Sequence, residues 1–435
     1  MRNIILGAGI SGIAAAYELK RNNFDSIVFE KNNNWGGLLD NFSIDGFRFD
    51  KFVHFSFAND KYVNDIFFQT KYISHEPLSY NFYKGHWLKH PAQNNLFPLK
   101  QFEKKKIVND FKSRKDKSVS EIKDYEEWLR VQYGDYFAEN FPMVYTEKYW
   151  TITAKELETK WVGSRMYKPS LEEVEKGCES AETPNTYYAK EMRYPSHGGY
   201  KTFITPMVKD IDIRTNSGVD TIDLNNKTVR LTDGKTYEFD NLISSLPLTE
   251  IYKLIKDVPD YVLAASEKLN YTSGYLVSLG FNKPEIADKL WFYIYDKDIL
   301  PARVYSPSMK SPDNAPKGCS SIQAEIYYNK GKKLDLSDSE ILEQTIDKFI
   351  SIGLFKEEDL IVKDIRSEKY ANVVFDHAIY VNRKIVIDYL VQNDIISVGR
   401  FGEWDYFWSD QSLLSGRDGA LKLINKLKKD TQSDD

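Results

Sequence analysis

A glycine cluster near the N-terminus has a spacing that could bind a phosphate. Gly7, Gly9 and Gly12 in GAGISG follow the apolar run NIIL and precede IAAAYELKRNN, whose apolar residues recur at helical spacing. In a strand–turn–helix unit the first glycine permits a tight turn, the second lets backbone N–H groups approach a pyrophosphate, and the third permits close packing. Glu30 ends the next apolar run, SIVFE, where an acid can accept hydrogen bonds from a ribose. The pattern predicts a dinucleotide at a helix N-terminus; a glycine turn without a ligand is the alternative.

Three later segments favour FAD over NAD. A second glycine pair, in WGGLL (35–39), suits a loop along the ribityl chain of FAD. GVDTIDLNNKTVRLTDGKTYEFDNLISSLP (218–247) has the layout of a segment that returns to the adenine, with Val219 in backbone contact. GRFGEWDYFWSDQ (399–411) would lie over the isoalloxazine, and the turn SGRDG (415–419) would open a helix facing flavin or phosphate oxygens. The expected FAD contacts are Gly7, Gly9, Ile10, Ser11, Gly12, Glu30, Lys31, Gly37, Leu38, Val219, Gly399, Arg400, Gln411 and Ser412.

The order of the predicted strands and helices that must position these residues indicates an α/β protein. Two of its domains are each built from segments that alternate along the chain. A Rossmann-like FAD-binding domain built from split segments is combined with an inserted helical subdomain and an antiparallel β-sheet substrate domain. The expected boundaries are FAD-binding 1–78, 191–260 and 386–435, substrate sheet 79–97 and 261–385, and helical subdomain 98–190. SYNFYKGHWLKHP (79–91) reads as a hairpin that turns at Lys84 and Gly85.

Composition narrows the class of protein further. The 435 residues carry a formal charge of −5 with no strongly basic block, which argues against nucleic-acid binding. Two cysteines without metal-ligand spacing suggest a reduced, cytoplasmic setting and no metal site. The first residues lack a signal-peptide pattern, and apolar runs long enough for a transmembrane helix are absent from the sequence. Oligomeric state is not readable from the sequence, so a homo-oligomer stays open.

Five blocks of sequence carry a family resemblance. They are GHWLKHPAQNN (85–95), YTEKYWTITAKELETKWVGSRM (145–166), RYPSHGG (193–199), IADKLWFYIYDKD (286–298) and ISVGRFGEWDY (396–406). In this order and spacing they resemble the UDP-galactopyranose mutases, nearer the eukaryotic type, within the FAD-dependent amine oxidase and protoporphyrinogen oxidase-like superfamily. The resemblance covers most of the chain in blocks. It implies FAD that is reduced for activity, with NADH or NADPH as a candidate reductant, and a nucleotide-sugar substrate in polysaccharide or glycoconjugate biosynthesis.

The resemblance also implies roles for individual residues. In that family N5 of the reduced flavin attacks the anomeric carbon, the nucleotide leaves, and the sugar recloses as the furanose. Arg165 and Arg303 would clamp the diphosphate, because guanidinium pairs bidentately with phosphate oxygens. The other implied contacts are Tyr406 and Tyr293 to phosphate, Trp291 and Asp410 to the sugar, Gln93 to the nucleoside, and His54 and Arg400 to the flavin. Taken alone, Trp291 and Tyr293 could be core residues, His54 a structural histidine and Arg165 a surface arginine.

Several positions depart from the family pattern. The flavin-side loop reads Lys51-Phe52-Val53-His54 where the family has Gly-Gly-His, which puts redox-linked loop movement in question. The nucleoside strand reads His90-Pro91-Ala92-Gln93 in place of Tyr-Pro-Phe-Gln, so base stacking should differ. Lys310 stands where a phosphate-side tyrosine is expected and could still contact a phosphate, and Asp410 stands where the family prefers Asn. The sequence therefore leaves open which sugar and which base are bound.

Two other functions remain as alternatives. A flavin oxidase or desaturase of the amine oxidase or protoporphyrinogen oxidase type shares the same FAD frame but needs an apolar or amine-binding cavity. A protein without turnover, with or without flavin, is the third, and the intact glycine fingerprint argues against its flavin-free form. The positions of Arg165 and Arg303 distinguish the mutase from the oxidase, since a diphosphate clamp requires both arginines to line the pocket.

Overall fold

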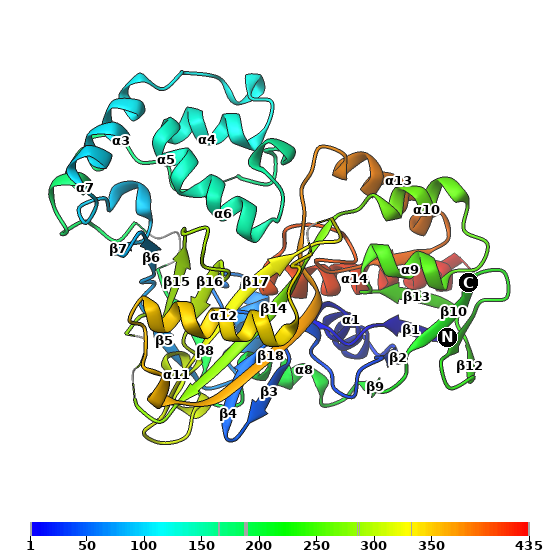
Figure 1. Ribbon diagram of the computed structural model, residues 1–435. Coiled ribbons are helices and arrows are strands. Elements are labelled where there is room, and N and C mark those ends of the chain that lie inside the picture. The colour runs from blue at the N-terminus through cyan, green and yellow to red at the C-terminus, as the bar shows by residue number, and fades with distance from the viewer. Residues whose placement is uncertain are drawn as a thin grey trace.

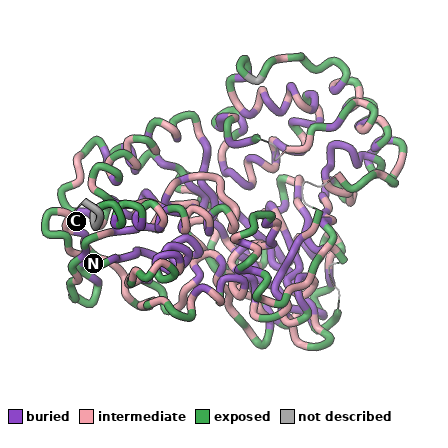
Figure 2. The backbone as a smooth tube through the Cα atoms, turned by 180° about the vertical axis from the view of Figure 1, so that it is seen from behind, coloured by how far each residue is buried: buried purple, intermediate pink, exposed green. Residues whose placement is uncertain are grey.

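The chain folds into three lobes that meet around one centre (Figure 1). The computed structural model describes residues 2–163, 166–186, 190–284, 286, 288–331 and 333–433. A lobe with a parallel sheet holds both termini, a lobe with a large antiparallel sheet lies beside it, and a lobe of helices lies above the antiparallel sheet in this view (Figure 1). Figure 2 shows that buried backbone follows the sheets and the inner faces of the helices.

The parallel-sheet lobe is built from distant segments of the chain. Its sheet has the order β19-β13-β1-β2-β9, with every neighbouring pair parallel. All four residues of β1, NIIL, are buried, as expected for a central strand covered on both faces. The strand–glycine turn–helix opening predicted from the sequence is therefore present. The strands are β1 Asn3–Leu6, β2 Ser26–Phe29, β9 Asp212–Arg214, β13 Asn241–Ser244 and β19 Ile395–Ser397.

Two helices from opposite ends of the chain pack tightly beside this sheet. The first is α1 (Ile10–Arg21) and the second is α14 (Ser409–Ser433). A Cβ added to Gly416 would lie 2.1 Å from the backbone oxygen of Ser11, so only glycine allows this approach. The predicted helix start at 415–419 is wrong: α14 begins at Ser409, and these residues lie inside the helix. Their glycines serve the packing of α14 and do not form a turn.

A small antiparallel sheet and several short helices complete this lobe. Within 218–247, the strands β10, β11 and β12 form an antiparallel meander. The remaining elements are β10 Val219–Asp223, β11 Thr228–Leu231, β12 Thr236–Glu238, α2 Lys61–Phe67, α8 Thr205–Val208, α9 Leu248–Leu254, α10 Asp260–Glu267 and α13 Ile379–Gln392. The expected boundary between residues 385 and 386 falls within α13.

The antiparallel-sheet lobe contains seven strands in the order β18-β14-β17-β16-β15-β6-β7. The predicted hairpin turns at Lys84 and Gly85, both with positive φ, and adds β6 and β7 to this sheet. Among the described strand pairs of this sheet, only β15 and β6 are parallel. The strands are β6 Tyr80–Tyr83, β7 His86–Lys89, β14 Tyr271–Phe281, β15 Trp291–Ile294, β16 Arg303–Tyr305, β17 Ser320–Tyr328 and β18 Leu360–Val373, with α11 Pro307–Lys310 and α12 Asp338–Ser351. Two-stranded pairs join β3 Asn41–Ile44 to β4 Phe47–Asp50, and β5 Tyr72–His75 to β8 Met192–Pro195.

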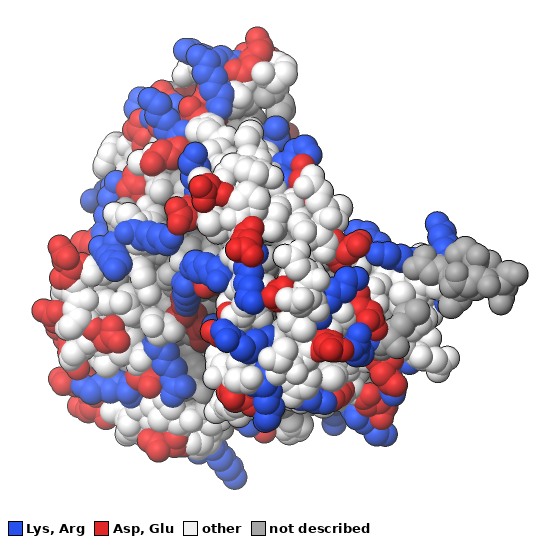
Figure 3. All heavy atoms as spheres, turned by 90° about the vertical axis from the view of Figure 1, so that its right-hand side faces the viewer, with Lys and Arg blue, Asp and Glu red and all other residues white. Residues whose placement is uncertain are grey.

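The helical lobe is formed by the part of the chain between β7 and β8. Aromatic side chains such as Trp128, Phe137 and Phe141 are buried among its helices and join the large hydrophobic core. The helices are α3 Gln101–Ser113, α4 Tyr125–Tyr133, α5 Asp135–Asn140, α6 Pro142–Tyr149 and α7 Leu171–Glu179. Within the described part of the chain, no helix combines the length and apolarity needed to cross a membrane. Positive and negative side chains are interspersed over the face shown in Figure 3.

Candidate functional site

One cavity of about 1000 Å³ runs from the glycine turn of the parallel-sheet lobe to the space beneath the helical lobe. This volume is at the upper end of the range for small-molecule sites, which leaves room for a large ligand. One part is lined by the N-terminus of α1, the β10 strand and the segment before α14. The other part is lined by α6, β15, β16 and β17. We call these the dinucleotide groove and the inner chamber.

The glycine turn forms the floor of the dinucleotide groove. Gly7 has φ +91°, a left-handed conformation that favours glycine, and a Cβ at Gly12 would lie 2.0 Å from the Gly7 carbonyl oxygen. A Cβ at Gly9 would meet no atom of the described residues within 4 Å, so this backbone faces open space. The turn therefore leaves bare backbone at the N-terminus of α1, where the helix dipole favours an anion.

Glu30 lies at the end of β2 and is held by the same turn. Its carboxylate accepts hydrogen bonds from the backbone N–H of Ala8 at 2.9 Å and of Asn32 at 2.9 Å. The residue is buried but lines the groove. Asn32 Nδ2 also donates to Oε1 at 2.8 Å. Each carboxylate oxygen has two lone pairs, so one acceptor position is left, on Oε2, for a ribose hydroxyl. Val219 lines the same groove from the start of β10.

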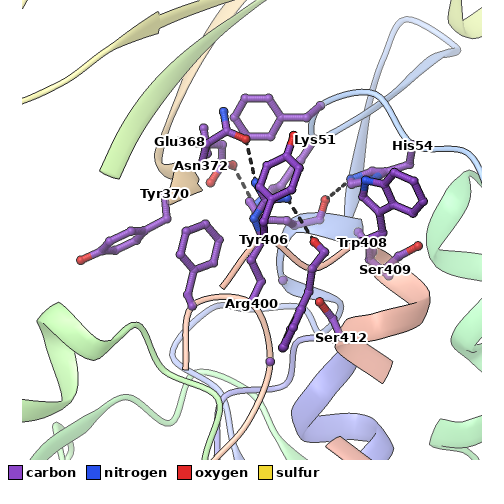
Figure 4. Close-up of a pocket in the computed structure, with 18 of the residues that line it drawn as sticks. Lys51, His54, Glu368, Tyr370, Asn372, Arg400, Tyr406, Trp408, Ser409 and Ser412 are labelled. Atoms are coloured by element: carbon purple, nitrogen blue, oxygen red, sulfur yellow. Dashed lines mark hydrogen bonds and ion pairs between the residues drawn. The ribbon is translucent and has the colours of Figure 1, made fainter. Parts of the chain in front are cut away.

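Arg400 faces the junction of groove and chamber (Figure 4). Its Nη2 donates to Asn372 Oδ1 at 2.8 Å and its Nη1 to the Phe407 carbonyl at 3.3 Å. The Nε is buried and has no partner among the described residues. An unpartnered buried N–H is costly, and a ligand atom at this point would remove that cost. Together with the glycine turn, this donor fits a flavin dinucleotide whose ring carries acceptor atoms.

The loop after β4 forms another wall of the junction. His54 Nε2 donates to the Leu38 carbonyl at 2.9 Å, and its ring stacks on Tyr200 with centroids 5.0 Å apart. Burial lowers the pKa of His54, with Asp50 opposing the shift, so the imidazole is neutral. The Lys51 Nζ pairs with Glu368 Oε1 at 2.9 Å across the junction (Figure 4). His54 therefore lines the junction of groove and chamber, with one ring nitrogen bonded to the protein.

Arg303 on β16 is the charged group of the inner chamber. Its Nε and Nη2 donate to one oxygen of Glu325, at 2.7 and 2.6 Å, and Nη2 lies 3.2 Å from the Tyr327 hydroxyl. Burial works to lower the pKa of Arg303, but Glu325 raises it well above its ordinary value. The other Glu325 oxygen accepts the Val53 N–H at 2.7 Å. Because both donors toward Glu325 lie on one edge of the guanidinium, Nη1 remains for a ligand; no described residue bonds it.

Tyrosines form most of the remaining chamber wall. Burial raises the pKa of Tyr145, Tyr149 and Tyr293, so all three hydroxyls stay protonated at neutral pH. Tyr293 and Trp291 alternate on β15, and both line the cavity. Tyr406 packs between Trp150 and Trp161, with ring centroids at 5.7 and 5.9 Å. The chamber therefore offers aromatic faces and neutral hydroxyl groups around Arg303.

Gln93 lies at the far end of the chamber. Its Nε2 donates to the Tyr167 carbonyl at 3.3 Å, and the Tyr133 hydroxyl donates to the same carbonyl at 2.7 Å. His90 is packed against the Tyr293 ring at 5.0 Å, and burial lowers its pKa to about 4, so it is neutral. Ala92 is fully buried and leaves no aromatic face at this point.

Most of the residues predicted from the sequence come together in this cavity. Lining residues are Gly7, Gly9, Ile10, Ser11, Glu30, Lys31, Gly37, Leu38, His54, Gln93, Val219, Trp291, Tyr293, Arg303, Gly399, Arg400, Tyr406, Asp410 and Ser412. Gly12 does not line the cavity and acts through packing. Gln411 is exposed, and its side chain accepts the Trp408 N–H at 2.9 Å at the start of α14, so it caps the helix. Arg165 lies outside the described residues.

Lys310 does not serve the cavity. Its Nζ lies 2.6 Å from Asp50 Oδ2, and both side chains are almost fully buried. Lys310 holds the pKa of Asp50 below its usual range against the effect of burial. The expectation that Lys310 could contact a phosphate is therefore wrong, because α11 turns the side chain into the core.

Sequence reasoning missed several residues at the centre of the site. They are Lys51, Tyr149, Glu325, Tyr327, Glu368 and Asn372. Glu325 and Tyr327 alternate in β17, whose other residues are mostly apolar or small and which is buried along most of its length. A charged residue inside such a strand is the signal that could have found this position, because an unpaired buried carboxylate is costly.

Comparison with known proteins agrees with this geometry. The sequence model of the family described as flavin-containing amine oxidoreductases matches residues 10–380. A 4,4'-diapophytoene desaturase of Staphylococcus aureus (strain COL) is 42% identical over 50 residues, 12% of this chain and 10% of that protein. A 1-hydroxycarotenoid 3,4-desaturase of Flavobacterium sp. (strain P99-3) is 49% identical over 47 residues, 11% of this chain and 10% of that protein. The matches span about a tenth of these relatives.

Solved structures share the whole fold. A crystal structure of reduced UDP-galactopyranose mutase superposes with a TM-score of 0.91 at 23% identity, covering 98% of this chain and 95% of that one. Wild-type putrescine oxidase bound to putrescine has a TM-score of 0.66 at 15% identity, with coverage of 98% and 99%. At these identities the likeness concerns the fold alone. The family match, by contrast, covers well over half of the sequence, and the protein belongs to the flavin-containing amine oxidoreductases.

Proposed function

We propose that the protein is a flavin-dependent mutase that interconverts the pyranose and furanose forms of a nucleotide-diphosphate sugar. The observation that carries this proposal is Arg303, fixed along one edge by Glu325 in an inner chamber that is continuous with the dinucleotide groove. A reduced flavin would supply a nucleophilic nitrogen at the anomeric carbon. The chain's own residues would bind the diphosphate, orient the sugar and exclude water.

Arg303 suits a diphosphate that must leave and return. Glu325 occupies the Nε side of the guanidinium and fixes its orientation, while the Nη1 side is left for phosphate oxygens. Glu325 also balances the charge of Arg303, so the arginine is not an isolated cation in a low-dielectric site. A permanently charged, rigid donor can keep the departed nucleotide close, which favours its return.

The tyrosines suit the sugar and phosphate oxygens. The hydroxyl groups of Tyr145 and Tyr293 remain protonated because burial raises their pKa, so they can donate hydrogen bonds without adding charge. Trp291, buried at the base of β15, offers an apolar face of the kind that packs on a sugar ring. Asp410 lies in the first turn of α14, and burial raises its pKa. We propose it as a sugar contact.

An amine oxidase or desaturase is the competing function. The aromatic chamber itself favours it, because aromatic faces attract an ammonium group. Arg303 argues against it, since its Nη1 edge, which does not face Glu325, would point a donor at an ammonium group and would stay unsatisfied beside an apolar chain. The finer points of the proposal are reduction by NADH or NADPH, a cytoplasmic setting and a role in surface-polysaccharide synthesis; they follow from the resemblance.

Binding of UDP to the oxidised enzyme tests the clamp before any turnover is measured. Wild-type enzyme and the Arg303→Ala variant would be titrated with UDP while flavin fluorescence is followed. We expect the affinity for UDP to fall by about tenfold to a hundredfold in the variant. This fall corresponds to the loss of charged hydrogen bonds, which contribute about 1.5–3 kcal/mol.

Arg383→Ala is the matched control. Arg383 pairs with Asp405 at 3.0 Å and does not line the cavity, so its removal should leave UDP affinity unchanged. Equal affinity in wild type and Arg303→Ala, with flavin retained, would remove Arg303 from the clamp. Failure of the wild type to bind UDP, together with oxygen consumption on amines, would favour the oxidase.

A further inference from the structure

Asn372 lies in the wall between the dinucleotide groove and the inner chamber, at a bulge in β18. Thr272 of β14 pairs with Asn372 and Gly274 pairs with Glu368, so residues 369–371 stand opposite Ser273 alone. The Ser273 hydroxyl donates to the Lys369 carbonyl at 2.8 Å and fixes the bulge. Bulges re-aim side chains next to sites, and this one brings Asn372 against Arg400 (Figure 4).

One oxygen of Asn372 receives a hydrogen bond from each compartment. Its Oδ1 accepts from Arg400 Nη2 at 2.8 Å and from the Tyr149 hydroxyl at 2.9 Å. Its Nδ2 donates to Thr272 Oγ1 at 3.2 Å, which fixes which end of the amide faces the arginine. The residue is buried, so the contacts to Arg400 are not shared with solvent.

Among the described residues, Arg303 and Arg400 are the arginines that line the cavity, and they differ in how their charge is balanced. Arg303 has the buried carboxylate of Glu325 at 2.6 Å. Arg400 has no carboxylate within ion-pair distance among the described residues, and the side chain that fixes its Nη2 is a neutral amide. An aspartate in place of Asn372 would have a similar shape but would compensate the charge of Arg400.

We propose that Asn372 is a positioning residue that holds Arg400 against the flavin while leaving its positive charge uncompensated. A cation held at the flavin ring stabilises the reduced, anionic form more than the oxidised form. The amide thereby influences the reduction potential of the flavin. Its oxygen also accepts the hydrogen bond from Tyr149. The Tyr149 ring in turn makes a cation–π contact with Arg303, whose guanidinium carbon lies 5.7 Å from the ring centroid, so the same amide is linked to the inner chamber. This inference does not rest on mutase chemistry, because it applies to any reaction of the bound flavin.

The test is the flavin midpoint potential of the holoenzyme in Asn372→Asp, Asn372→Ala and wild type. In Asn372→Asp the ratio of reduced to oxidised flavin at a fixed applied potential should fall at least about tenfold, which is about 30 mV for a two-electron couple. Asn372→Ala should shift the ratio in the same direction but less, because Arg400 loses its anchor while its charge stays unbalanced.

Asn382→Asp is the matched control, since Asn382 is also buried, bonds the Ala378 carbonyl at 3.0 Å, and does not line the cavity. Its potential should match wild type. An unchanged potential in Asn372→Asp with flavin bound, or an equal shift in Asn382→Asp, would overturn the inference. If Asn372→Asp does not retain flavin, Asn372→Ala decides: an unchanged potential there overturns the inference equally.

Discussion

Two buried ion pairs show how residues of the same type serve different purposes in this molecule. Arg303 and Glu325 face the chamber, and the arginine side chain keeps 18% exposure there. Lys310 and Asp50 are sealed, at 0% and 1% exposure, and the Tyr194 hydroxyl donates to the same carboxylate at 2.7 Å. The Arg303–Glu325 pair leaves an arginine donor free for a ligand, whereas the Lys310–Asp50 pair is buried away from the cavity. We expect the first to govern ligand binding and the second only stability.

Substitution of Lys310 by methionine tests this division. Removing the ammonium leaves the carboxylate of Asp50 buried and unpaired, which should lower the free energy of unfolding by about 3–5 kcal/mol. UDP affinity of the folded fraction should not change, because Lys310 does not line the cavity. Urea denaturation and UDP titration measure the two quantities. A loss of UDP affinity without a loss of stability would return Lys310 to the phosphate site.

At the scale of elements, the flavin-side loop 51–55 is fixed from several directions. Phe52 has φ +64°, and its ring stacks on Tyr327 with centroids 6.1 Å apart. A Cβ at Gly274 would lie 2.6 Å from that ring, so β14 makes room for it. Val53 N–H is bonded to Glu325. A loop anchored in this way should not move when the flavin is reduced.

Hydrogen exchange of peptides that cover 51–55 checks this expectation. Exchange should be equal in the oxidised and reduced holoenzyme. In Phe52→Gly the loss of ring packing should speed exchange by about tenfold, an opening free energy lower by about 1.4 kcal/mol. Slower or faster exchange of the wild-type loop on reduction would show that it responds to the flavin despite its anchors.

A second contact between elements involves Glu250 on α9 and the bulged part of β18. The Glu250 carboxylate accepts from Lys369 Nζ at 2.7 Å and from the Tyr370 hydroxyl. Burial works to raise the pKa of Glu250, but these bonds and Lys253 lower it to about 2. Because the folded pKa is below the unfolded value, the stabilisation is complete above about pH 4.5 and is lost as pH falls toward 2.

The Glu250→Gln variant should therefore be less stable than wild type at pH 7, by about 1–2 kcal/mol after allowance for solvent screening of a partly exposed group. The difference should shrink as pH is lowered from 5 to 3. Thermal unfolding followed over this range measures it. Glu343→Gln, in an exposed pair with Lys363, is the control and should show little difference at any pH. A constant gap for Glu250→Gln would exclude its ionisation as the cause.

At the scale of the whole molecule, the sequence predicted what local rules determine. The glycine turn and Glu30 were found because their spacing is tied to one strand–turn–helix unit. The start of α14 was misplaced because Gly416 and Gly419 look like turn residues, whereas they are small in order to pack on α1 and on Val398. Lys310 and Asn372 could not be placed, since a short helix and a bulge decide where those side chains point.

The interleaved architecture has a consequence for function. Segments from both ends of the chain form the dinucleotide groove, while strands and helices between them form the inner chamber. The two compartments therefore share walls at β17, β18 and the loop 51–55. Glu325 and Asn372 lie in these shared walls and each contacts both sides. Flavin state and ligand binding should therefore be coupled through buried side chains.

Product chromatography of the reduced holoenzyme tests the proposed mutase function most directly. Purified enzyme, reduced with dithionite without oxygen, would be incubated with a panel of UDP- and dTDP-hexoses, and oxidised enzyme would serve as the control. We predict a new isomer from at least one nucleotide sugar with reduced enzyme only, which would also identify the sugar. The absence of an isomer from every sugar, with flavin bound and reduced, would contradict the account and favour an oxidase or desaturase.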